Sequence, residues 1–166
     1  MLPKSPEEFH QKLGLIFHAL LAIPLALFIY LFLELRHNNP LPILNNKLLL
    51  VFATYSLPIL GVLLGWIGYR RWRRNLSQIN REDNLPVMLS NYGKSMTNFY
   101  YYTAASSAIW VLGLYLTTSY LFIAGYVVLL FFMSLQRPTP KKYVEDLNLT
   151  GENRNIILQK KEFGDS

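Results

Sequence analysis

His18 is the residue of this chain whose type and position most directly suggest chemistry. It lies within an uncharged stretch that runs from Leu13 to Leu33, long enough to cross a membrane. A titratable side chain inside a membrane span is a default indication of function, and histidine exchanges protons near neutral pH. The more ordinary interpretation, which we favour, is a histidine hydrogen-bonded to a neighbouring helix or to interfacial water. Glu34 follows the same stretch at its outer end, close enough to water for its carboxylate to reach it.

Pro24 and Pro58 lie near the middles of the first two apolar stretches. A proline inside a helix removes one backbone hydrogen bond, which leaves the carbonyl groups of Leu20 and Thr54 without their usual donors. Two kinks at the same depth are typical of the discontinuous helices that form binding sites in transporters. The alternative hypothesis for this chain is therefore a small transporter or proton-coupled channel with a midplane site near His18, Pro24 and Pro58. Because hydroxyl groups or waters often satisfy the freed carbonyls in membrane helices, the kinks alone are weak evidence.

Other kinds of chemistry find little support in the sequence. There is no cysteine, so a disulfide, a thiol nucleophile and a cysteine metal site are all excluded. His10 and His37 fall outside the apolar stretch at its two ends, so neither pairs with His18 across one haem. The chain contains no paired acids at catalytic spacing, no glycine-rich phosphate loop and no HExxH motif. We therefore expect no enzymatic activity, no cofactor and no metal.

Four helices are expected to position these residues in a membrane. Between Lys94 and Arg137 lie 42 consecutive residues without a charged side chain. At a rise of about 1.5 Å per residue, such a helix would be about 63 Å long, roughly twice the ~30 Å thickness of a hydrocarbon core. This stretch is expected to form two spans that meet in a tight turn at Thr117 and Thr118. Together with the two earlier apolar stretches, the expected spans are residues 13–35, 48–69, 98–116 and 119–135.

The predicted fold class is thus an all-α integral membrane protein, with four transmembrane helices in two antiparallel hairpins. A cytoplasmic N-terminus of residues 1–12 precedes the spans. An interfacial basic loop, residues 70–97, is expected between the two hairpins. A short helical tail, residues 136–166, would follow the last span. Within it, Thr139 is placed to cap a helix that begins at Pro140.

The lysines and arginines of the chain are concentrated in the segments that lie on one side of the four expected spans. Of the 16 lysines and arginines, 14 fall in the N-terminus, the central loop and the tail. With four spans these segments lie on one side of the membrane, which the positive-inside rule assigns to the cytoplasm. We expect both termini in the cytoplasm of a bacterial inner membrane. The net charge of +6 is therefore interpreted as a topology signal and not as a nucleic-acid surface.

A basic cluster at the end of the second span is the most distinctive polar segment. It places Trp72 between pairs of arginines, and Trp72, Leu76 and Ile79 would share one face of a continued helix. We interpret this cluster as a topology anchor attracted to anionic lipid headgroups, rather than as a specific lipid or protein site. Its members are Arg70, Arg71, Trp72, Arg73 and Arg74.

Small residues form strips along the later spans. Such residues let helix backbones approach closely, which is a main source of attraction between helices in lipid. Their first use is to hold the bundle together, and a strip that faces outward could receive a protein partner or a second copy of the chain. The function expected on balance is a non-catalytic accessory or scaffold subunit of a membrane assembly. The residues of these strips are Gly61, Gly65 and Gly68 on the second span and Ala104 and Ala108 on the third.

Overall fold

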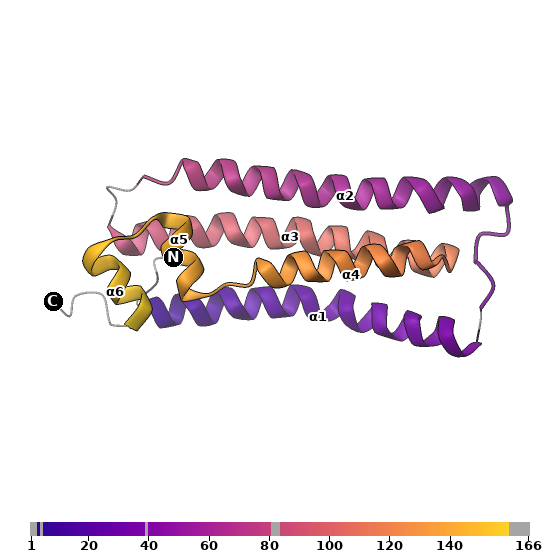
Figure 1. Cartoon of the computed structure of the whole chain (residues 1–166), viewed down its shortest axis with the longest axis horizontal. Coiled ribbons are helices and arrows are strands. Elements are labelled where there is room, and N and C mark those ends of the chain that lie inside the picture. Colours follow the sequence, from indigo (N-terminus) through magenta and orange to yellow (C-terminus); the bar gives the residue numbers. More distant parts are fainter. Residues whose placement is uncertain (1–2, 4, 39, 81–83, 160–166) are drawn as a thin grey trace. The chain divides into compact units, whose positions relative to one another are not determined.

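The computed structural model describes residues 3, 5–38, 40–80 and 84–159. Every regular element within those ranges is a helix, which confirms the all-α prediction. Lys4, Arg81, Lys160 and Lys161 of the basic segments fall outside the described residues, as does the middle of the central loop. In chain order the helices are α1 (Pro6–Asn38), α2 (Lys47–Ser77), α3 (Leu85–Thr117), α4 (Tyr120–Leu135), α5 (Pro140–Leu147) and α6 (Gly151–Gln159) (Figure 1).

Two helix starts follow directly from local sequence. Ser5 precedes α1, and its Oγ accepts a hydrogen bond from the backbone N–H of Glu8 at 3.2 Å. At α5 the Oγ of Thr139 accepts from the backbone N–H of Lys142 at 3.2 Å, with Pro140 in the first turn. The cap predicted at Thr139 is confirmed.

Two helices of the described chain, α1 and α2, are long and apolar enough to cross a membrane. The pair α4 and α5, which is bent by 78°, would be a third if it formed one broken span. Of the most apolar stretch of each helix, only 11% is buried within the protein in α1 and 6% in α2. Such outward-facing apolar surface is unusual for a soluble protein and is what lipid-exposed helices present. The chain therefore has the helices of a membrane protein.

The chain divides into two compact units. Unit 1 comprises Met1–His18, Tyr69–Tyr100 and Arg137–Ser166, and unit 2 comprises Ala19–Gly68 and Tyr101–Gln136. Unit 1 thus contains the start of α1, the end of α2, the start of α3, and α5 with α6. Unit 2 contains the remainder of α1, α2 and α3, together with α4.

Residues 70–97, expected to form an interfacial basic loop, contain more helix than that description implies. There α2 continues to Ser77 and α3 begins at Leu85, so most of that segment is helical. The physical reason is a row of apolar and aromatic side chains at helical spacing, all of which are buried. These are Leu85, Met88, Leu89, Tyr92, Met96 and Phe99.

Unit 2 has a separate core, in which the second half of α3 packs against α4. The rings of Trp110 and Phe122 lie 5.9 Å apart in an edge-to-face arrangement, and those of Phe28 and Tyr126 are stacked at 4.1 Å. Gly125 leaves room for the Trp110 ring, because a Cβ at this position would overlap it. The turn between the helices has Thr118 at a φ of 51°, and Ser119 caps α4.

Candidate functional site

An aromatic cluster at the centre of unit 1 joins three helices. Phe9 comes from α1, Tyr92 from α3 and Tyr143 from α5. The ring centroids are 5.3 Å apart for Phe9 and Tyr143, 5.5 Å for Tyr92 and Tyr143, and 6.5 Å for Phe9 and Tyr92. Each ring is at most 8% exposed. Aromatic pairs of this kind stabilise a fold beyond the contribution of the apolar area that they bury. The cluster therefore holds α5 against α1 and α3.

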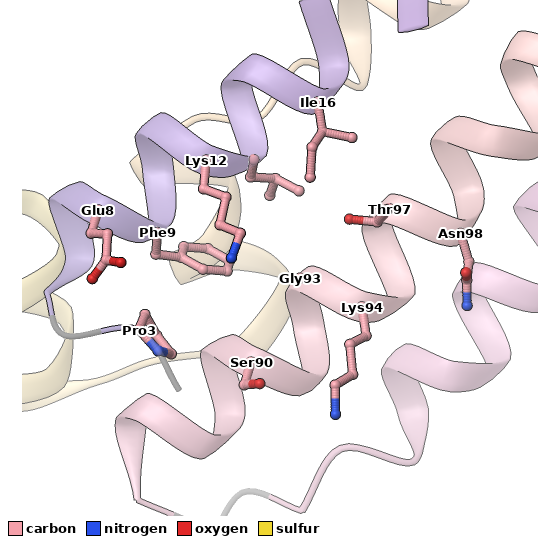
Figure 2. A pocket seen from close by; sticks show the side chains of 11 residues that line it. Pro3, Glu8, Phe9, Lys12, Ile16, Ser90, Gly93, Lys94, Thr97 and Asn98 are labelled. Carbon is pink, nitrogen blue, oxygen red and sulfur yellow. The ribbon is translucent and has the colours of Figure 1, made fainter. Parts of the chain in front are cut away.

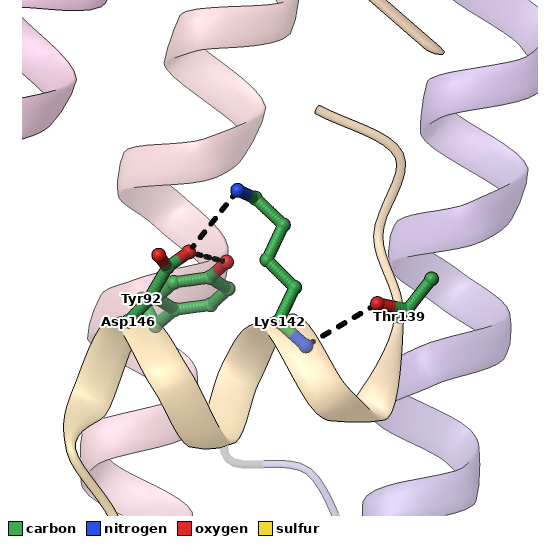
Figure 3. Close-up of polar contacts among 4 residues, drawn as sticks. All are labelled: Tyr92, Thr139, Lys142 and Asp146. Atoms are coloured by element: carbon green, nitrogen blue, oxygen red, sulfur yellow. Dashed lines mark hydrogen bonds and ion pairs between the residues drawn. The ribbon is translucent and has the colours of Figure 1, made fainter. Parts of the chain in front are cut away.

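Polar groups at the edge of this cluster fix α5 further. The Tyr92 hydroxyl donates to Oδ2 of Asp146 at 2.7 Å, and Nζ of Lys142 lies 3.7 Å from the same oxygen (Figure 3). The Lys142 ammonium also lies 5.3 Å from the centroid of the Trp72 ring. On the α1 side, Nδ1 of His10 and the Tyr143 hydroxyl are hydrogen-bonded at 2.9 Å.

Burial determines what the phenols of this cluster can do. Desolvation raises the pKa of Tyr92 well above its ordinary value, and the neighbouring Asp146 carboxylate raises it further. Burial likewise raises the pKa of Tyr143. Both phenols therefore stay neutral at physiological pH and act as hydrogen-bonding groups, not as bases.

Unit 1 also contains a groove with a volume of about 450 Å³ between the start of α1 and the start of α3. Two lysines, Lys12 from α1 and Lys94 from α3, contribute to its wall. Figure 2 shows the Lys12 side chain and the Thr97 hydroxyl reaching into the groove from the two facing helices. We call it the Lys12–Lys94 groove. It is lined by Pro3, Glu8, Phe9, Lys12, Leu13, Ile16, Ser90, Gly93, Lys94, Thr97 and Asn98.

The residues singled out for a midplane site have different surroundings in the described structure. His18 is exposed, with its ring 5.3 Å from that of Phe17. In unit 2, Pro24 is buried and Pro58 is half-buried, and neither lines the cavity of about 260 Å³ beside Glu34 or the one of about 270 Å³ beside Arg36. Glu34 accepts a hydrogen bond from Nδ2 of Asn38 at 2.8 Å. These positions give the transporter hypothesis no direct support.

The basic cluster separates into two kinds of residue. Its four arginines, Arg70, Arg71, Arg73 and Arg74, are exposed. Trp72, however, is only 3% exposed, and its ring lies 5.6 Å from that of Phe99 inside unit 1. The structure therefore differs from the expected membrane-facing Trp72. The indole instead lies in the core between α2 and α3, in contact with the rings of Tyr69 and Phe99.

The glycines of α2 pack against α3 within unit 2. A Cβ added at Gly61 would lie 2.8 Å from Nε1 of Trp110, and one added at Gly68 would lie 2.5 Å from Cβ of Tyr102. The Ser106 hydroxyl donates to the carbonyl oxygen of Gly61 at 2.7 Å, a buried hydrogen bond between the two helices. Gly65 is the looser contact, with 3.7 Å between its added Cβ and Oγ of Ser106.

The small residues of α3 have a different environment. Ala104 is half-buried and Ala108 is exposed. An outward face of α3 therefore remains uncovered in unit 2. Its exposed residues recur at helical spacing and are Tyr101, Ala105, Ala108, Leu112 and Tyr115.

Among the described residues, no group of three or more histidines, aspartates or glutamates is placed to hold a metal ion. The sequence reasoning missed the Tyr92, Tyr143 and Asp146 contacts, although the helical spacing from Leu85 to Phe99 was a signal for the helix that carries Tyr92. No protein-family model, curated protein or solved structure matches this chain.

Proposed function

We propose that the chain is a non-catalytic accessory or scaffold subunit of a membrane assembly, with four transmembrane helices in two antiparallel hairpins. The spans would be residues 13–35, 48–69, 98–116 and 119–135, with both termini in the cytoplasm of a bacterial inner membrane. The observation that carries this proposal is the outward-facing apolar surface of α1 and α2.

The uncovered face of α3 supports the scaffold role. Ala105 and Ala108 lie at its centre and would let a partner helix approach closely, while Tyr101 and Tyr115 flank them. Gly61 and Gly68 of α2 are already occupied by contacts with Trp110 and Tyr102, whereas the small residues on the outer face of α3 are open to another chain.

Topology is tested with reporters fused after Asn84 and after Ser166. Both reporters should give a cytoplasmic signal, because four spans return the chain to the same side. A periplasmic signal from one fusion alone would overturn the four-span arrangement, and a periplasmic signal from both would overturn the cytoplasmic assignment of the termini.

Association is tested with a photo-crosslinking residue at Ala108, in membranes, with the same residue at Val62 on the exposed side of α2 as the matched control. A scaffold should give a discrete crosslinked product from Ala108 and none from Val62. The mass of that product distinguishes a second copy from a different protein. Recovery of an uncrosslinked monomer at both positions would count against the scaffold role.

A further inference from the structure

We propose that the Lys12–Lys94 groove binds the headgroup of an anionic phospholipid, with the Lys12 ammonium and the Thr97 hydroxyl on the phosphate, the Lys94 ammonium adding positive charge at the rim, and an acyl chain along the apolar wall. This proposal rests on the membrane placement given above for α1 and α3. It differs from a general attraction of basic residues to lipid, because it assigns one bound molecule to one groove.

Charge complementarity is the first argument. Within the described part of the chain, neither Lys12 nor Lys94 makes an ion pair, although both line the same cavity. Ser90 and Thr97 add hydroxyl donors to the wall. Charge-assisted hydrogen bonds from ammonium groups to phosphate oxygens are among the stronger polar contacts in proteins. Glu8 is the one acid in the wall, so the lysines leave the groove with net positive charge.

The depth of the groove is the second argument. Lys12 is the last charged residue before the apolar stretch of α1, and Lys94 is the last before the 42 uncharged residues that begin in α3. Lysines at the ends of apolar stretches lie at the level of lipid phosphates. The two lysines mark that level independently on two helices, and the same groove contains both of them.

The shape of the groove is the third argument. Leu13 and Ile16 line it on the side where α1 becomes apolar, so the wall changes from polar to apolar along the helix. Gly93 lets the Phe9 ring lie close against α3 in the wall of the groove, because a Cβ there would lie 2.8 Å from Cε2 of Phe9. The volume of about 450 Å³ falls in the range of roughly 300–1,000 Å³ that small-molecule sites occupy. A phospholipid has a charged headgroup and apolar acyl chains, which correspond to the charged and apolar ends of the groove.

The experiment measures lipid binding to the full chain in detergent by native mass spectrometry. Phosphatidylglycerol, phosphatidylcholine and soluble glycerol phosphate are added separately. The groove variant is Lys12→Gln with Lys94→Gln, and the matched control is Arg73→Gln with Arg74→Gln, which removes the same charge from exposed positions outside the groove. Thr97→Phe fills the groove without changing its charge, and Lys12→Arg with Lys94→Arg tests rescue.

The unaltered chain should retain phosphatidylglycerol more strongly than phosphatidylcholine. The groove variant should lose roughly 25-fold in affinity for phosphatidylglycerol, and the arginine control should lose much less. Thr97→Phe should also weaken binding, and the arginine replacement should restore it. Equal losses in the groove variant and its control, or no loss in either, would overturn the proposal.

Two further results separate the possible failures. If glycerol phosphate displaces the lipid at equal concentration, the groove binds phosphate without a need for acyl chains, and the lipid assignment is wrong. If the two topology reporters remain cytoplasmic while lipid preference is absent, the groove proposal fails and the four-span proposal stands. Reporters on opposite sides would reject the membrane placement itself, and the groove proposal with it.

Discussion

The hydrogen bonds by which tyrosines join helices in unit 1 differ from the serine and threonine contacts of α3 in unit 2. In unit 1 the Tyr92 hydroxyl donates to the Asp146 carboxylate, and Tyr143 bonds to the His10 ring. In unit 2 the hydroxyl groups of Ser106 and Thr117 donate to backbone carbonyl oxygens, those of Gly61 and Gly113. Charged side chains are tolerated where water is near, whereas backbone oxygens are the partners available in hydrocarbon. The two units are thus held together by different polar contacts, side chain to side chain in unit 1 and side chain to backbone along α3 in unit 2.

The largest loss of stability should come from a substitution at a closely packed glycine of unit 2. Gly125→Ala places a Cβ inside the Trp110 ring, an overlap so severe that the destabilisation should reach or exceed about 3 kcal/mol, the upper end for overpacked cores. We expect the thermal midpoint in detergent, followed by circular dichroism, to fall markedly. Gly14→Ala is the matched control, because nothing lies within 4 Å of its added Cβ. Equal midpoints for the two variants would contradict the tight packing.

The polar contacts of unit 1 should give the next largest effect. Tyr92→Phe removes a hydrogen bond to a carboxylate, which contributes about 1.5–3 kcal/mol. Since this bond ties α5 to α3, we expect faster tryptic cleavage after Lys141, at the start of α5, as well as a lower thermal midpoint. Tyr101→Phe is the control, because its side chain is 58% exposed in unit 2. An unchanged rate of proteolysis in Tyr92→Phe would show that the hydrogen bond between Tyr92 and Asp146 does not hold α5 against α3.

High pH should destabilise unit 1 through the same tyrosines. Their pKa values are raised in the folded state above the unfolded value of about 10. This stability is complete below about pH 10 and is lost as the pH rises toward the folded pKa, by up to about 1.4 kcal/mol per pH unit for each phenol. Denaturant unfolding between neutral pH and pH values above 10 measures the slope. Tyr143→Phe should reduce that slope, and an unchanged slope would show that Tyr143 is not the responsible group.

The hydrogen bond between α2 and α3 should give the smallest effect. Ser106→Ala removes the donor to the Gly61 carbonyl, and such bonds between membrane helices average about 0.6 kcal/mol. A small drop in unfolding free energy is expected in detergent titrations. Ser134→Ala, at an exposed position of α4, is the control and should have no effect. If Ser106→Ala lowered the unfolding free energy as much as Tyr92→Phe, the polar contacts of the two units would contribute equally to stability, contrary to the comparison.

The elements that depend on local signals were predictable from the sequence. The apolar stretches predicted the membrane character of α1 and α2, and Thr139 with Pro140 predicted the start of α5. Their causes act within one or two helical turns, so a short window of sequence contains them.

The contacts of unit 1 were not predictable in the same way. Tyr92 and Asp146 are 54 residues apart, and nothing local in either segment indicates the other. Trp72 was misread because arginines surround it in sequence, while in the helix they lie on the exposed side and the indole lies on the buried side. His18 attracted attention by its apolar neighbours, yet His10 is the histidine that bonds across helices.

The length of α4 has a consequence for the surrounding lipid. Its 16 residues extend about 24 Å, several ångströms less than the ~30 Å hydrocarbon thickness of an average bilayer. As a span, α4 would thin the membrane beside it, while the longer α1 and α2 would not. The protein would then prefer thin bilayers, and lipids with short acyl chains would collect along one side of it.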